Sequence, residues 1–434
     1  MGRSGDLPQG TSRFMATGSE WPDDTDCRIL HVDMDAFYAW VALRELPELR
    51  ERAVIVAGVS IRGVVLSANY LARTFGVHSA MRAARAKRLC PRAVFLPPTF
   101  PAYQEVSSGV MRIFREVAPL VEPLSLDEAF IDVGGALRRL RRTPAKIGAE
   151  IRAAVVAEFG ITCSVGVAST KFVAKLASGM AKPDGMLVVP TVETLAFLHP
   201  LPLSALWGVG KRTAERLGEV GLDTVADVAR TPLPRLRRVL GVAGAEHLHA
   251  LANGRDDRAV VPDTVEKSIG AEETFEVDHV DRQVLKRELL RLAERTAGSL
   301  RRRGLSGRTV SIKVRFADFS TITRARTLPV ATNVTQEIYR TAATLLDEQV
   351  PPGAVRLIGV RVEQLGEGSG IGQQLMLDTP ERGWREADHA VDETRSRFGR
   401  AAVGPASLLG PRPERSGVTE PRPQAEPGRD RSDG

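Results

Sequence analysis

Three carboxylates inside apolar, strand-like segments constrain the fold of this chain more than any other feature. Asp33 ends the apolar run "RILHVD", and Asp127 and Glu128 stand together in "SLDEAFIDV". A buried carboxylate is unfavourable unless it is paired or bound to a metal ion. If the two segments are neighbouring strands, their acidic groups meet at one end of a shared sheet. The alternatives are a solvated turn or helix N-cap at Asp33 and Asp35, and a solvated hairpin end at Asp127 and Glu128.

Length, composition and charge narrow the class of protein. The chain has 434 residues, 43% of them hydrophobic, and a net charge of +7. This length predicts roughly three or four domains, and no run approaches the roughly 20 apolar residues that span a bilayer. Residues 1–26 are polar and lack the apolar core of a signal peptide. The three scattered cysteines fit neither a disulfide framework nor a zinc site, so we expect a cytoplasmic protein with no membrane partner.

The spacing of apolar residues predicts several α+β layers. Helical and strand-like segments alternate over 101–190, which is typical of a βαββαβ sheet layer. From 191 to 254 the pattern changes to short helices interrupted by glycine. A long helix over 281–302 and the strands "TVSIKVRF" and "VRLIGVRVEQL" predict a second α/β unit at 266–366. Residues 405–434 are rich in proline and glycine, and we expect them to be disordered.

The carboxylates indicate a hard metal ion. Three acidic oxygen donors without His or Cys suit Mg²⁺, with Mn²⁺ as the alternative, rather than zinc. Two such ions about 3.5–4 Å apart could hold the attacking and leaving oxygens of a phosphoryl transfer. A bound triphosphate would then require cations nearby. The segments "SANYLAR" and "STKFVAK" offer Tyr70, Arg73 and Lys171, although each of these alone is as consistent with a solvated surface.

The order of six motifs resembles the Y-family DNA polymerases, and within them the DNA polymerase IV (DinB) branch. The resemblance covers residues 27 to about 366. The motifs are "HVDMDAFYAWVA", "VVLSANYLARTFGVHSAM", "EPLSLDEAFIDV", "SVGVASTKFVAKLASGMAKPDG", "LWGVGKRTAERLGEVGL" and "EKSIGAEETF". Six blocks in the family's order are far more specific than one short motif.

The resemblance implies a right-hand polymerase of α+β class. It implies a βαββαβ palm, small fingers, a helical thumb with a helix-hairpin-helix, and an α/β little finger. The implied limits are a polar N-terminal extension at 1–26, palm at 27–35 and 101–190, fingers at 36–100, thumb at 191–254, linker at 255–265, little finger at 266–366, and a flexible tail at 367–434.

The resemblance also implies the catalytic residues. Asp33, Asp127 and Glu128 match the metal-binding carboxylates, with the main-chain carbonyl of Met34 as a further ligand and two Mg²⁺ as cofactors. Asp35 matches an acidic position that is not usually a ligand. Tyr38 matches the aromatic steric gate, where a ring would collide with a ribose 2′-OH. The positions that match triphosphate-binding residues are Ser67, Tyr70, Arg73 and Lys171.

Two further segments indicate contacts with DNA. In "LWGVGKRTAERLGEVGL", Gly208 and Gly210 would let backbone amides approach a phosphate, and Lys211 begins the following helix. A plain turn between helices is the alternative. Between Arg301 and Arg326 there are eight basic residues and one acidic residue. We expect alternation to bring several of these charges to one sheet face that contacts duplex phosphates. The candidates are Lys313, Arg315, Arg324 and Arg326.

The segment "GQQLMLDTPER" resembles the peptide by which bacterial polymerases bind the sliding clamp. Its candidate residues are Gln374, Leu375 and Leu377. Asp378 stands where many clamp peptides have an aromatic residue, and a solvated loop is the alternative.

We therefore expect a monomeric, low-fidelity translesion DNA polymerase whose partners are primer-template DNA, a dNTP and the sliding clamp. The segment at 36–100 is too small for extensive fingers, which favours a roomy site. Two other functions stay open at this point. One is a different metal-dependent nucleotidyl transferase or cyclase, which would need no DNA track. The other is a catalytically silent relative that only binds DNA or the clamp.

Overall fold

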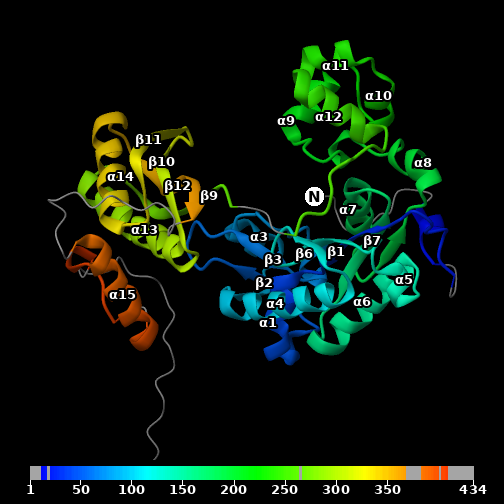
Figure 1. The fold of residues 1–434 in the computed structure, drawn as a ribbon, viewed down its shortest axis with the longest axis horizontal. Helices are drawn as coiled ribbons and strands as arrows, with labels where there is room; N and C mark the ends of the chain where they lie inside the picture. Colours follow the sequence, from blue (N-terminus) through cyan, green and yellow to red (C-terminus); the bar gives the residue numbers. More distant parts are fainter. Residues whose placement is uncertain (1–10, 17–19, 263–265, 368–382, 400–401, 409–434) are drawn as a thin grey trace, which may run out of the picture. The chain divides into compact units, whose positions relative to one another are not determined.

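The chain folds into two compact units, one of residues 1–58 and 63–264, the other of residues 59–62 and 265–434. The described residues form three sheets with flanking helices, which confirms the predicted α+β class (Figure 1). The computed structural model describes residues 11–16, 20–262, 266–367, 383–399 and 402–408.

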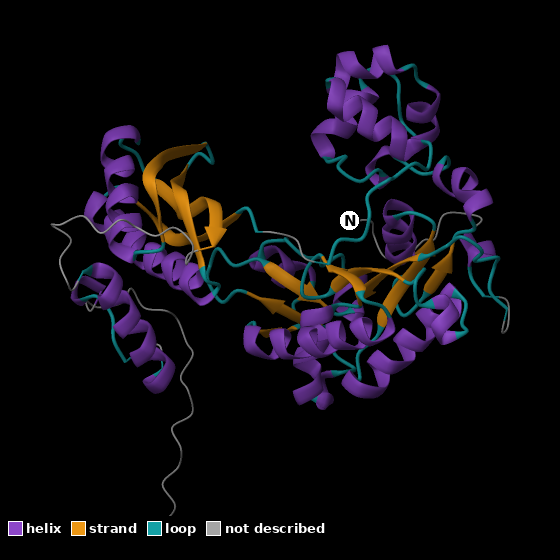
Figure 2. Ribbon diagram, viewed as in Figure 1, coloured by secondary structure: helices purple, strands orange, loops and turns teal. Residues whose placement is uncertain are grey.

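A five-stranded sheet forms the centre of the first unit, in the order β5-β6-β1-β7-β8. Strand β1 is antiparallel to both β6 and β7, and β5 and β6 form the hairpin expected around Asp127. Helices lie on both faces of this sheet (Figure 2). The bounds are β1 (Ile29–Met34), β5 (Leu120–Pro123), β6 (Glu128–Asp132), β7 (Cys163–Ala168) and β8 (Met186–Val188).

Alternation along β1 assigns its side chains to two different layers. Leu30, Val32 and Met34 belong to the core shared with α4 and α6. His31 and Asp33 point to the opposite face, as the period of two along a strand requires, and that face is covered by α7. The helices are α4 (Phe100–Val117), α6 (Pro144–Phe159) and α7 (Lys171–Met180).

Gly166 of β7 lets α7 approach the sheet closely. A Cβ atom at this position would lie 2.0 Å from the carbonyl oxygen of Ala174 and 2.5 Å from the amide nitrogen of Ser178. Gly166 is also the register partner of His31 on β1. Glycine here therefore brings the side chains of α7 within reach of the odd-numbered residues of β1.

A second, three-stranded sheet in the order β3-β2-β4 has its own small core. Asn69 ties it to the helix that follows, because its side-chain oxygen accepts hydrogen bonds from the amides of Ala72 and Val54, both at 3.0 Å. The elements are β2 (Val54–Ala57), β3 (Val65–Ala68), β4 (Val94–Leu96), α1 (Phe37–Glu45), α2 (Tyr70–Thr74) and α3 (Ala83–Leu89).

Short helices complete the first unit, packed around Leu217, Val228, Leu236 and Leu248. Gly208, in the turn before α9, has φ +97°, a conformation that side chains other than glycine rarely adopt. The helices are α8 (Thr194–Leu198), α9 (Lys211–Gly218), α10 (Val225–Arg230), α11 (Leu233–Leu240) and α12 (Val242–Ala252), with the short α5 (Leu137–Leu140) beside the central sheet.

Part of the polar N-terminal extension is packed onto this unit. The ring of Phe14 is 2% exposed and meets the ring of Phe197 edge-on at 5.2 Å. The short 3₁₀ segments of the described chain are η1 (Thr11–Phe14), η2 (Pro47–Leu49), η3 (Thr191–Glu193), η4 (Leu203–Ala205) and η5 (Ala406–Leu408).

The second unit is a four-stranded antiparallel sheet in the order β11-β10-β12-β9. Two helices cover one face, where Val310, Ile312 and Val314 of β10 join Leu289 and Leu346 in a common core. The elements are β9 (Ser268–His279), α13 (Arg282–Arg302), β10 (Leu305–Phe316), β11 (Thr321–Thr332), α14 (Thr335–Gln349) and β12 (Val355–Glu367).

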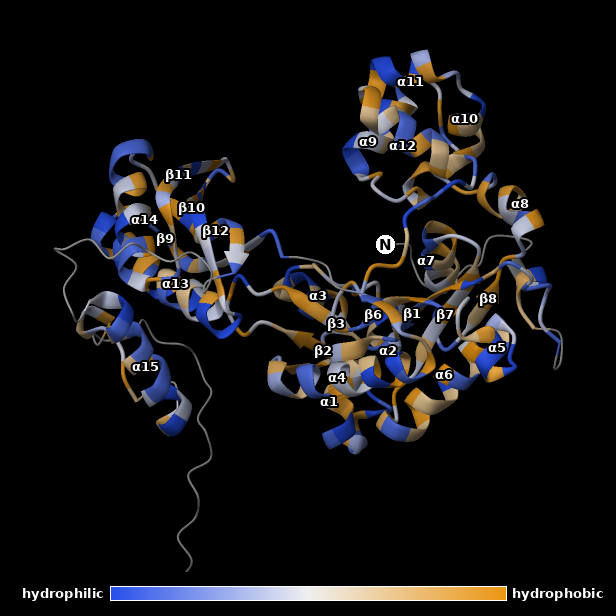
Figure 3. Ribbon diagram, in the orientation of Figure 1, coloured by the Kyte–Doolittle hydropathy of each residue, from blue (hydrophilic) through white to orange (hydrophobic). Residues whose placement is uncertain are grey.

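A helix stands within the segment expected to be a flexible tail. Helix α15 (Trp384–Phe398) has no buried residue and is coloured largely hydrophilic in Figure 3. Arg301 of α13, 5% exposed, donates hydrogen bonds to Asp388 at 2.9 Å and Asp392 at 2.6 Å. Arg395 pairs with Glu294 of α13 at 2.5 Å. Ion pairs rather than apolar burial therefore hold α15 in place.

Arg301→Met is expected to release α15. Truncating one partner of a largely buried ion-pair network leaves the other charges unpaired and is unfavourable, here by about 2 kcal/mol. Hydrogen exchange of the backbone amides of 384–398 should then become at least about tenfold faster. Arg295→Met, on the exposed part of the same helix, is the matched control and should leave this exchange unchanged. Equal exchange in both variants would contradict the account of how α15 is held.

Candidate active site

The strand register brings two of the predicted carboxylates face to face. Asp33 of β1 is the direct partner of Glu128 of β6. Asp127 immediately precedes Glu128, and its carbonyl oxygen accepts a hydrogen bond from the amide of Met34 at 2.8 Å. Residues far apart in the sequence thus meet at one end of the β1–β6 pair.

Two lysines lie on these acidic groups. Lys182 Nζ donates to Asp33 Oδ1 at 2.6 Å and to the carbonyl oxygen of Met34 at 3.1 Å. Lys175 pairs with Glu128 Oε2. Asp127 instead accepts from the hydroxyl of Ser125 at 2.5 Å. The ammonium group of Lys182 therefore occupies two of the oxygens that were predicted to bind a metal ion.

Burial and the neighbouring lysines shift the pKa values of Asp33 and Glu128 in opposite directions. Burial raises the pKa of Asp33 to about 6, although the charge of Lys182 opposes this. Burial also raises the pKa of Glu128, but His31 and Lys175 outweigh it and bring that pKa down to about 2. Burial lowers the pKa of His31 to about 4. At neutral pH, Glu128 is therefore ionised and the imidazole of His31 is neutral.

The donor set fits a hard cation. Asp33, Asp127, Glu128 and the Met34 carbonyl offer oxygen only, as Mg²⁺ and Mn²⁺ prefer. Two of these oxygens already hold a cation, the ammonium of Lys182. Within the described ranges, no three His, Cys, Asp or Glu side chains are gathered as ligands of one ion. Metal binding at Asp33 and the Met34 carbonyl would therefore require Lys182 to move away from these oxygens.

Asp35, which was left out of the predicted ligands, is held by hydrogen bonds within the protein. Its carboxylate is fully buried. It accepts hydrogen bonds from the hydroxyls of Tyr70 at 3.2 Å, Thr162 at 2.7 Å and Ser164 at 2.9 Å, and from the amide of Asp184 at 2.8 Å. These four bonds satisfy the carboxylate and connect β1, α2 and β7.

Tyr38 lies in an aromatic cluster beside the carboxylates. Its ring centroid is 4.4 Å from that of Tyr103, with the planes 31° apart, and 6.3 Å from that of Phe100. Burial, together with the negative charge of Asp127, raises the pKa of Tyr38. Phe37 is the buried member of the pair, 3% exposed. Tyr38 is thus held by its neighbours within electrostatic range of a predicted metal ligand.

Three of the residues predicted to bind a triphosphate lie on neighbouring elements. Ser67 is buried on β3, and α2 begins with Tyr70. The guanidinium carbon of Arg73 lies 4.7 Å from the centre of the Tyr70 ring. The hydroxyl of Tyr70 donates to Asp35, two residues after Asp33, at 3.2 Å. Burial, together with the negative charge of Asp35, raises the pKa of Tyr70.

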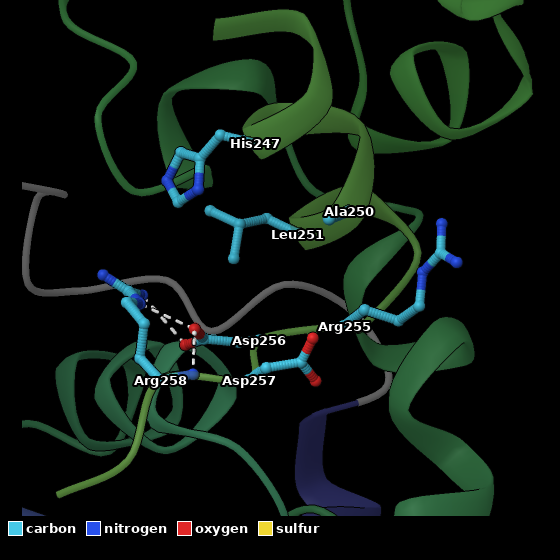
Figure 4. A pocket seen from close by; sticks show the side chains of 7 residues that line it. All are labelled: His247, Ala250, Leu251, Arg255, Asp256, Asp257 and Arg258. Carbon is cyan, nitrogen blue, oxygen red and sulfur yellow. Dashed lines mark hydrogen bonds and ion pairs between the residues drawn. The ribbon is translucent and has the colours of Figure 1, made fainter. Parts of the chain in front are cut away.

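The fourth predicted triphosphate residue, Lys171, lies in a different environment. It is 5% exposed, and its ammonium donates to Glu122 at 2.5 Å and to the carbonyl oxygen of Ala259 at 3.2 Å. Asp256, in the same segment as Ala259, accepts from the amide of Phe172 at the start of α7 at 2.9 Å. Asp256 pairs with Arg258 at 2.6 Å, as Figure 4 shows. Both residues line a pocket of about 360 Å³. Lys171 thus anchors the chain that follows α12.

Sequence reasoning did not single out Lys175 and Lys182, although both stand in a motif that it quoted. Lys171 and Lys175 are four residues apart, which places their side chains on one face of α7, and Lys182 follows two residues after the end of that helix. Each of them contacts a different acid, namely Glu122, Glu128 and Asp33 respectively. The four-residue spacing from Lys171 was the available signal for Lys175, and no periodic signal pointed to Lys182.

The predicted hairpin of the thumb presents its backbone to open space. Gly208 and Gly210 have no atoms within 4 Å of the position of an added Cβ. Gly210 is the N-cap of α9, and Lys211 begins that helix with a 90% exposed side chain. Both glycines are exposed, so a DNA phosphate could approach the backbone at this turn, although the amide of Val209 between them already donates to the Leu206 carbonyl at 3.0 Å.

The strand register separates the four basic residues expected on one sheet face. Lys313 and Arg315 alternate with the core residues of β10 and so point away from α13 and α14. Arg324 and Arg326 of β11 are the partners of Ile312 and Val310, so they point to the helix-covered face. There Arg326 pairs with Glu348 at 2.9 Å, and Arg324 donates to the carbonyl oxygen of Gln349 at 3.2 Å. The expectation of a single basic face is corrected accordingly.

The predicted clamp-binding residues Gln374, Leu375 and Leu377 lie outside the described residues. Among the helices that the structure describes, none is both long enough and apolar enough to cross a membrane.

Comparison with known proteins identifies relatives for most of the chain. The family model "impB/mucB/samB family" matches residues 32–179, and the model of its C-terminal domain matches residues 266–377. A model described as "DNA polymerase-iota, thumb domain" matches residues 204–256. DNA polymerase IV of Desulfatibacillum aliphaticivorans is 45% identical over 388 residues, which are 89% of this chain and 98% of that protein. DNA polymerase IV of Streptomyces coelicolor is 46% identical over 341 residues, covering 78% and 71% of the two chains.

Solved structures share the fold. The "Y-family DNA polymerase chimera Dbh-Dpo4(243-245)-Dbh" is 24% identical with a TM-score of 0.70, over 77% of this chain and 98% of that one. The "Insertion ternary complex of Dbh DNA polymerase" is 24% identical with a TM-score of 0.56 and the same coverage.

Proposed function

Because the chain belongs to the DNA polymerase IV branch of the Y-family DNA polymerases, we propose that its carboxylate site extends primers past damaged template bases by metal-dependent phosphoryl transfer. The observation that carries this proposal is the pairing of Asp33 with Glu128 across β1 and β6, next to Asp127. A cation already lies on Asp33 and the Met34 carbonyl. The site thus combines oxygen ligands with a position that favours positive charge.

Asp33, Asp127, Glu128 and the Met34 carbonyl would hold two divalent cations, Mg²⁺ or Mn²⁺. Cations bound there would stabilise negative charge on the transferring phosphoryl group and lower the pKa of the attacking primer 3′-OH. The protein's own contribution is to hold these oxygens at the end of a rigid, fully paired strand. Asp35 follows this strand directly, and its four hydrogen bonds hold the strand end in place.

We assign the role of a triphosphate ligand to Lys182 rather than to Lys171. Lys171 is buried against Glu122 and the Ala259 carbonyl. Lys182 lies on the oxygens that the cations would take, so their binding would displace its ammonium toward the nearest new anion. With Arg73 and Tyr70, it would then neutralise the charge of the triphosphate that the divalent cations leave uncompensated.

The primer-template duplex would be held by sequence-independent phosphate contacts. The open sheet face of the second unit carries Lys313 and Arg315, and β12 adds Arg361, the register partner of Ser311, to this face. Glu272 pairs with Lys313 at 2.8 Å and reduces the net charge there. The thumb hairpin at Gly208 and Gly210 would supply backbone contacts to the DNA backbone.

Salt dependence tests which of the two groups of cations contacts DNA. Each lost phosphate contact should lower the slope of log K against log salt concentration by about 0.9. Lys313→Gln and Arg315→Gln are each expected to lower that slope by this amount in a binding titration with primer-template DNA. Arg324→Gln and Arg326→Gln are the matched controls and should leave it unchanged, because these side chains contact α14. If instead only Arg324→Gln and Arg326→Gln lowered the slope, the DNA would contact the face that carries these two arginines.

Primer extension on two templates tests the proposed function. The full chain, Mg²⁺ and single dNTPs are incubated with one primer on an undamaged template and on a template with an abasic site. We expect insertion on both. Failure on the undamaged template, with Mn²⁺ as well as Mg²⁺, would overturn the polymerase activity of this site. Extension that stops before the abasic site would overturn only the translesion role.

Clamp binding through Gln374, Leu375 and Leu377, a monomeric state and a cytoplasmic location stay predictions. A cyclase is disfavoured, because the relatives that match most of the chain are DNA polymerases. A catalytically silent relative is disfavoured by the intact carboxylate set, and primer extension separates it from an active enzyme.

A further inference from the structure

His31 is a buried polar residue to which the proposed chemistry gives no task. Its side chain is 1% exposed, on the face of β1 that α7 covers. The edge-to-face contact with Phe130, with ring centroids 4.7 Å apart, restricts rotation of the imidazole. Both ring nitrogens nevertheless have partners on α7, namely Ser178 and Lys175, and Nε2 also lies 3.4 Å from Glu128 Oε2 of β6.

Three contacts close a ring of hydrogen bonds between His31 and α7. His31 Nδ1 lies 2.6 Å from Ser178 Oγ. Ser178 Oγ donates to the carbonyl oxygen of Lys175 at 2.9 Å. Lys175 Nζ lies 3.4 Å from His31 Nε2. Gly166 makes this ring possible, since a side chain there would collide with the backbone of α7.

The chemistry of the donors determines the tautomer of His31. The Ser178 hydroxyl donates to the Lys175 carbonyl, so toward His31 Nδ1 it can only accept. The proton of the neutral ring is therefore on Nδ1 and is donated to Ser178 Oγ. Nε2 of the neutral ring then carries no proton and can accept from the Lys175 ammonium, which lies 3.4 Å away and also pairs with Glu128. Each donor in the ring then meets an acceptor.

This ring of hydrogen bonds determines where the charged ammonium group of Lys175 lies. Its ammonium is held between His31 Nε2 and Glu128 Oε2. Without the imidazole acceptor, the same ammonium could turn toward the indole ring of Trp207, whose centroid is 5.8 Å away. A carboxylate with one oxygen fixed by an ammonium group presents only its other oxygen to the site.

We propose that His31 is a positioning residue, which through Ser178 and Lys175 fixes the carboxylate of Glu128 so that one defined oxygen faces the site beside Asp33. This inference rests on the proposed function, because it concerns the same carboxylates. His31 does not contact the reacting atoms. It acts through Lys175, whose side chain is 31% exposed and would otherwise be free to leave Glu128.

Two amide variants separate positioning from general packing. The side-chain oxygen of His31→Gln reaches the position of Nε2 and can still accept from Lys175. The shorter amide of His31→Asn reaches only the position of Nδ1, so it can contact Ser178 but not Lys175. Both variants remove the imidazole and its contact with Phe130. A purely structural role of His31 would therefore make them equivalent.

The first readout is the reactivity of Lys175 in the full chain without metal or DNA. Acetylation by N-hydroxysuccinimidyl acetate is followed by mass spectrometry, with the exposed Lys146 as internal reference. In His31→Asn, Lys175 should be acetylated about five to ten times faster than in the wild type, because it has lost one of its two acceptors. In His31→Gln the rate should be within about twofold of the wild type.

The second readout is single-nucleotide insertion. His31→Asn should lower kcat about tenfold, with KM for the dNTP within twofold, and His31→Gln should restore most of the loss. Equal labelling and equal kcat in the two variants would overturn the inference, as would labelling of His31→Asn at the wild-type rate. If the wild type itself fails to insert nucleotides, the proposed function fails. The labelling result would still decide whether the hydrogen bonds of His31 hold Lys175 in place.

Discussion

Asp33→Asn is expected to lower kcat for nucleotide insertion by about 10³-fold or more, while the affinity for primer-template DNA stays within about twofold. The substitution keeps the size of the side chain and one oxygen that can accept from Lys182, but it removes the charge and replaces the other oxygen by a donor. A divalent cation at the reaction centre contributes several kcal/mol of transition-state stabilisation, and each 1.4 kcal/mol corresponds to about tenfold in rate. Single-turnover insertion and a DNA-binding titration measure the two quantities separately.

Asp132→Asn is the matched control for this experiment. Asp132 lies four residues after Glu128 on β6, so it is on the same sheet face but at the opposite end of the β1–β6 pair. It lies 3.6 Å from Arg28 rather than near Asp33. Its substitution should leave kcat within about twofold of the wild type. A wild-type rate in Asp33→Asn, or equal losses in the two variants, would contradict the assignment of the site.

Tyr38→Ala is expected to reduce the preference for dNTPs over rNTPs by about 100-fold, expressed as the ratio of the two kcat/KM values. The ring of Tyr38 is held against Tyr103 and Phe100 and cannot easily turn away from a 2′-OH. Removing the ring opens space where the ribose hydroxyl would otherwise collide. Most of the change should appear as improved use of rNTPs, measured by insertion of each nucleotide opposite the same template base.

Tyr38→Phe is the control for the phenolic hydroxyl. It retains the ring and its stacking on Tyr103, so sugar discrimination should remain close to that of the wild type. Loss of discrimination in Tyr38→Phe would show that a hydrogen bond from the hydroxyl, rather than the bulk of the ring, distinguishes the sugars. Unchanged discrimination in Tyr38→Ala would remove Tyr38 from the site.

The part of the fold that positions the carboxylates could be predicted from the sequence, because it depends on local patterns. Alternation in "ILHVD" and "EAFID" determines which side chains of β1 and β6 share a face. The short hairpin before Glu128 brings Asp127 to the end of the sheet. The register then makes Asp33 and Glu128 direct partners, as expected from two buried strands that end in acidic residues.

The partners of the lysines could not be predicted in the same way. Lys171 and Lys182 stand in one motif, so the sequence alone does not tell which of them faces the site. Lys171 contacts the Ala259 carbonyl only because residues 256–261 approach α7 in the folded chain. The faces of Arg324 and Arg326 depend on the register between β10 and β11, which shifts at an irregularity between Gly307 and Thr309. These features are determined by tertiary contacts, which a single sequence does not display.

Helix α15 illustrates the same limit for the tail. Its polar sequence buries no residue, so hydrophobic periodicity gave no reason to expect it to be docked. What holds it is Arg301, an arginine that the sequence offered only as one member of a basic run. Ion pairs between distant segments leave no periodic signal.

Counting bound metal ions tests the central claim most directly. Mn²⁺ binding is measured by electron paramagnetic resonance for the full chain with primer-template DNA and a non-hydrolysable dNTP analogue. The account predicts about two Mn²⁺ ions for each wild-type complex. It predicts at most about one for Asp33→Asn, and an unchanged count for Asp132→Asn. The same number of ions in Asp33→Asn as in the wild type would contradict it.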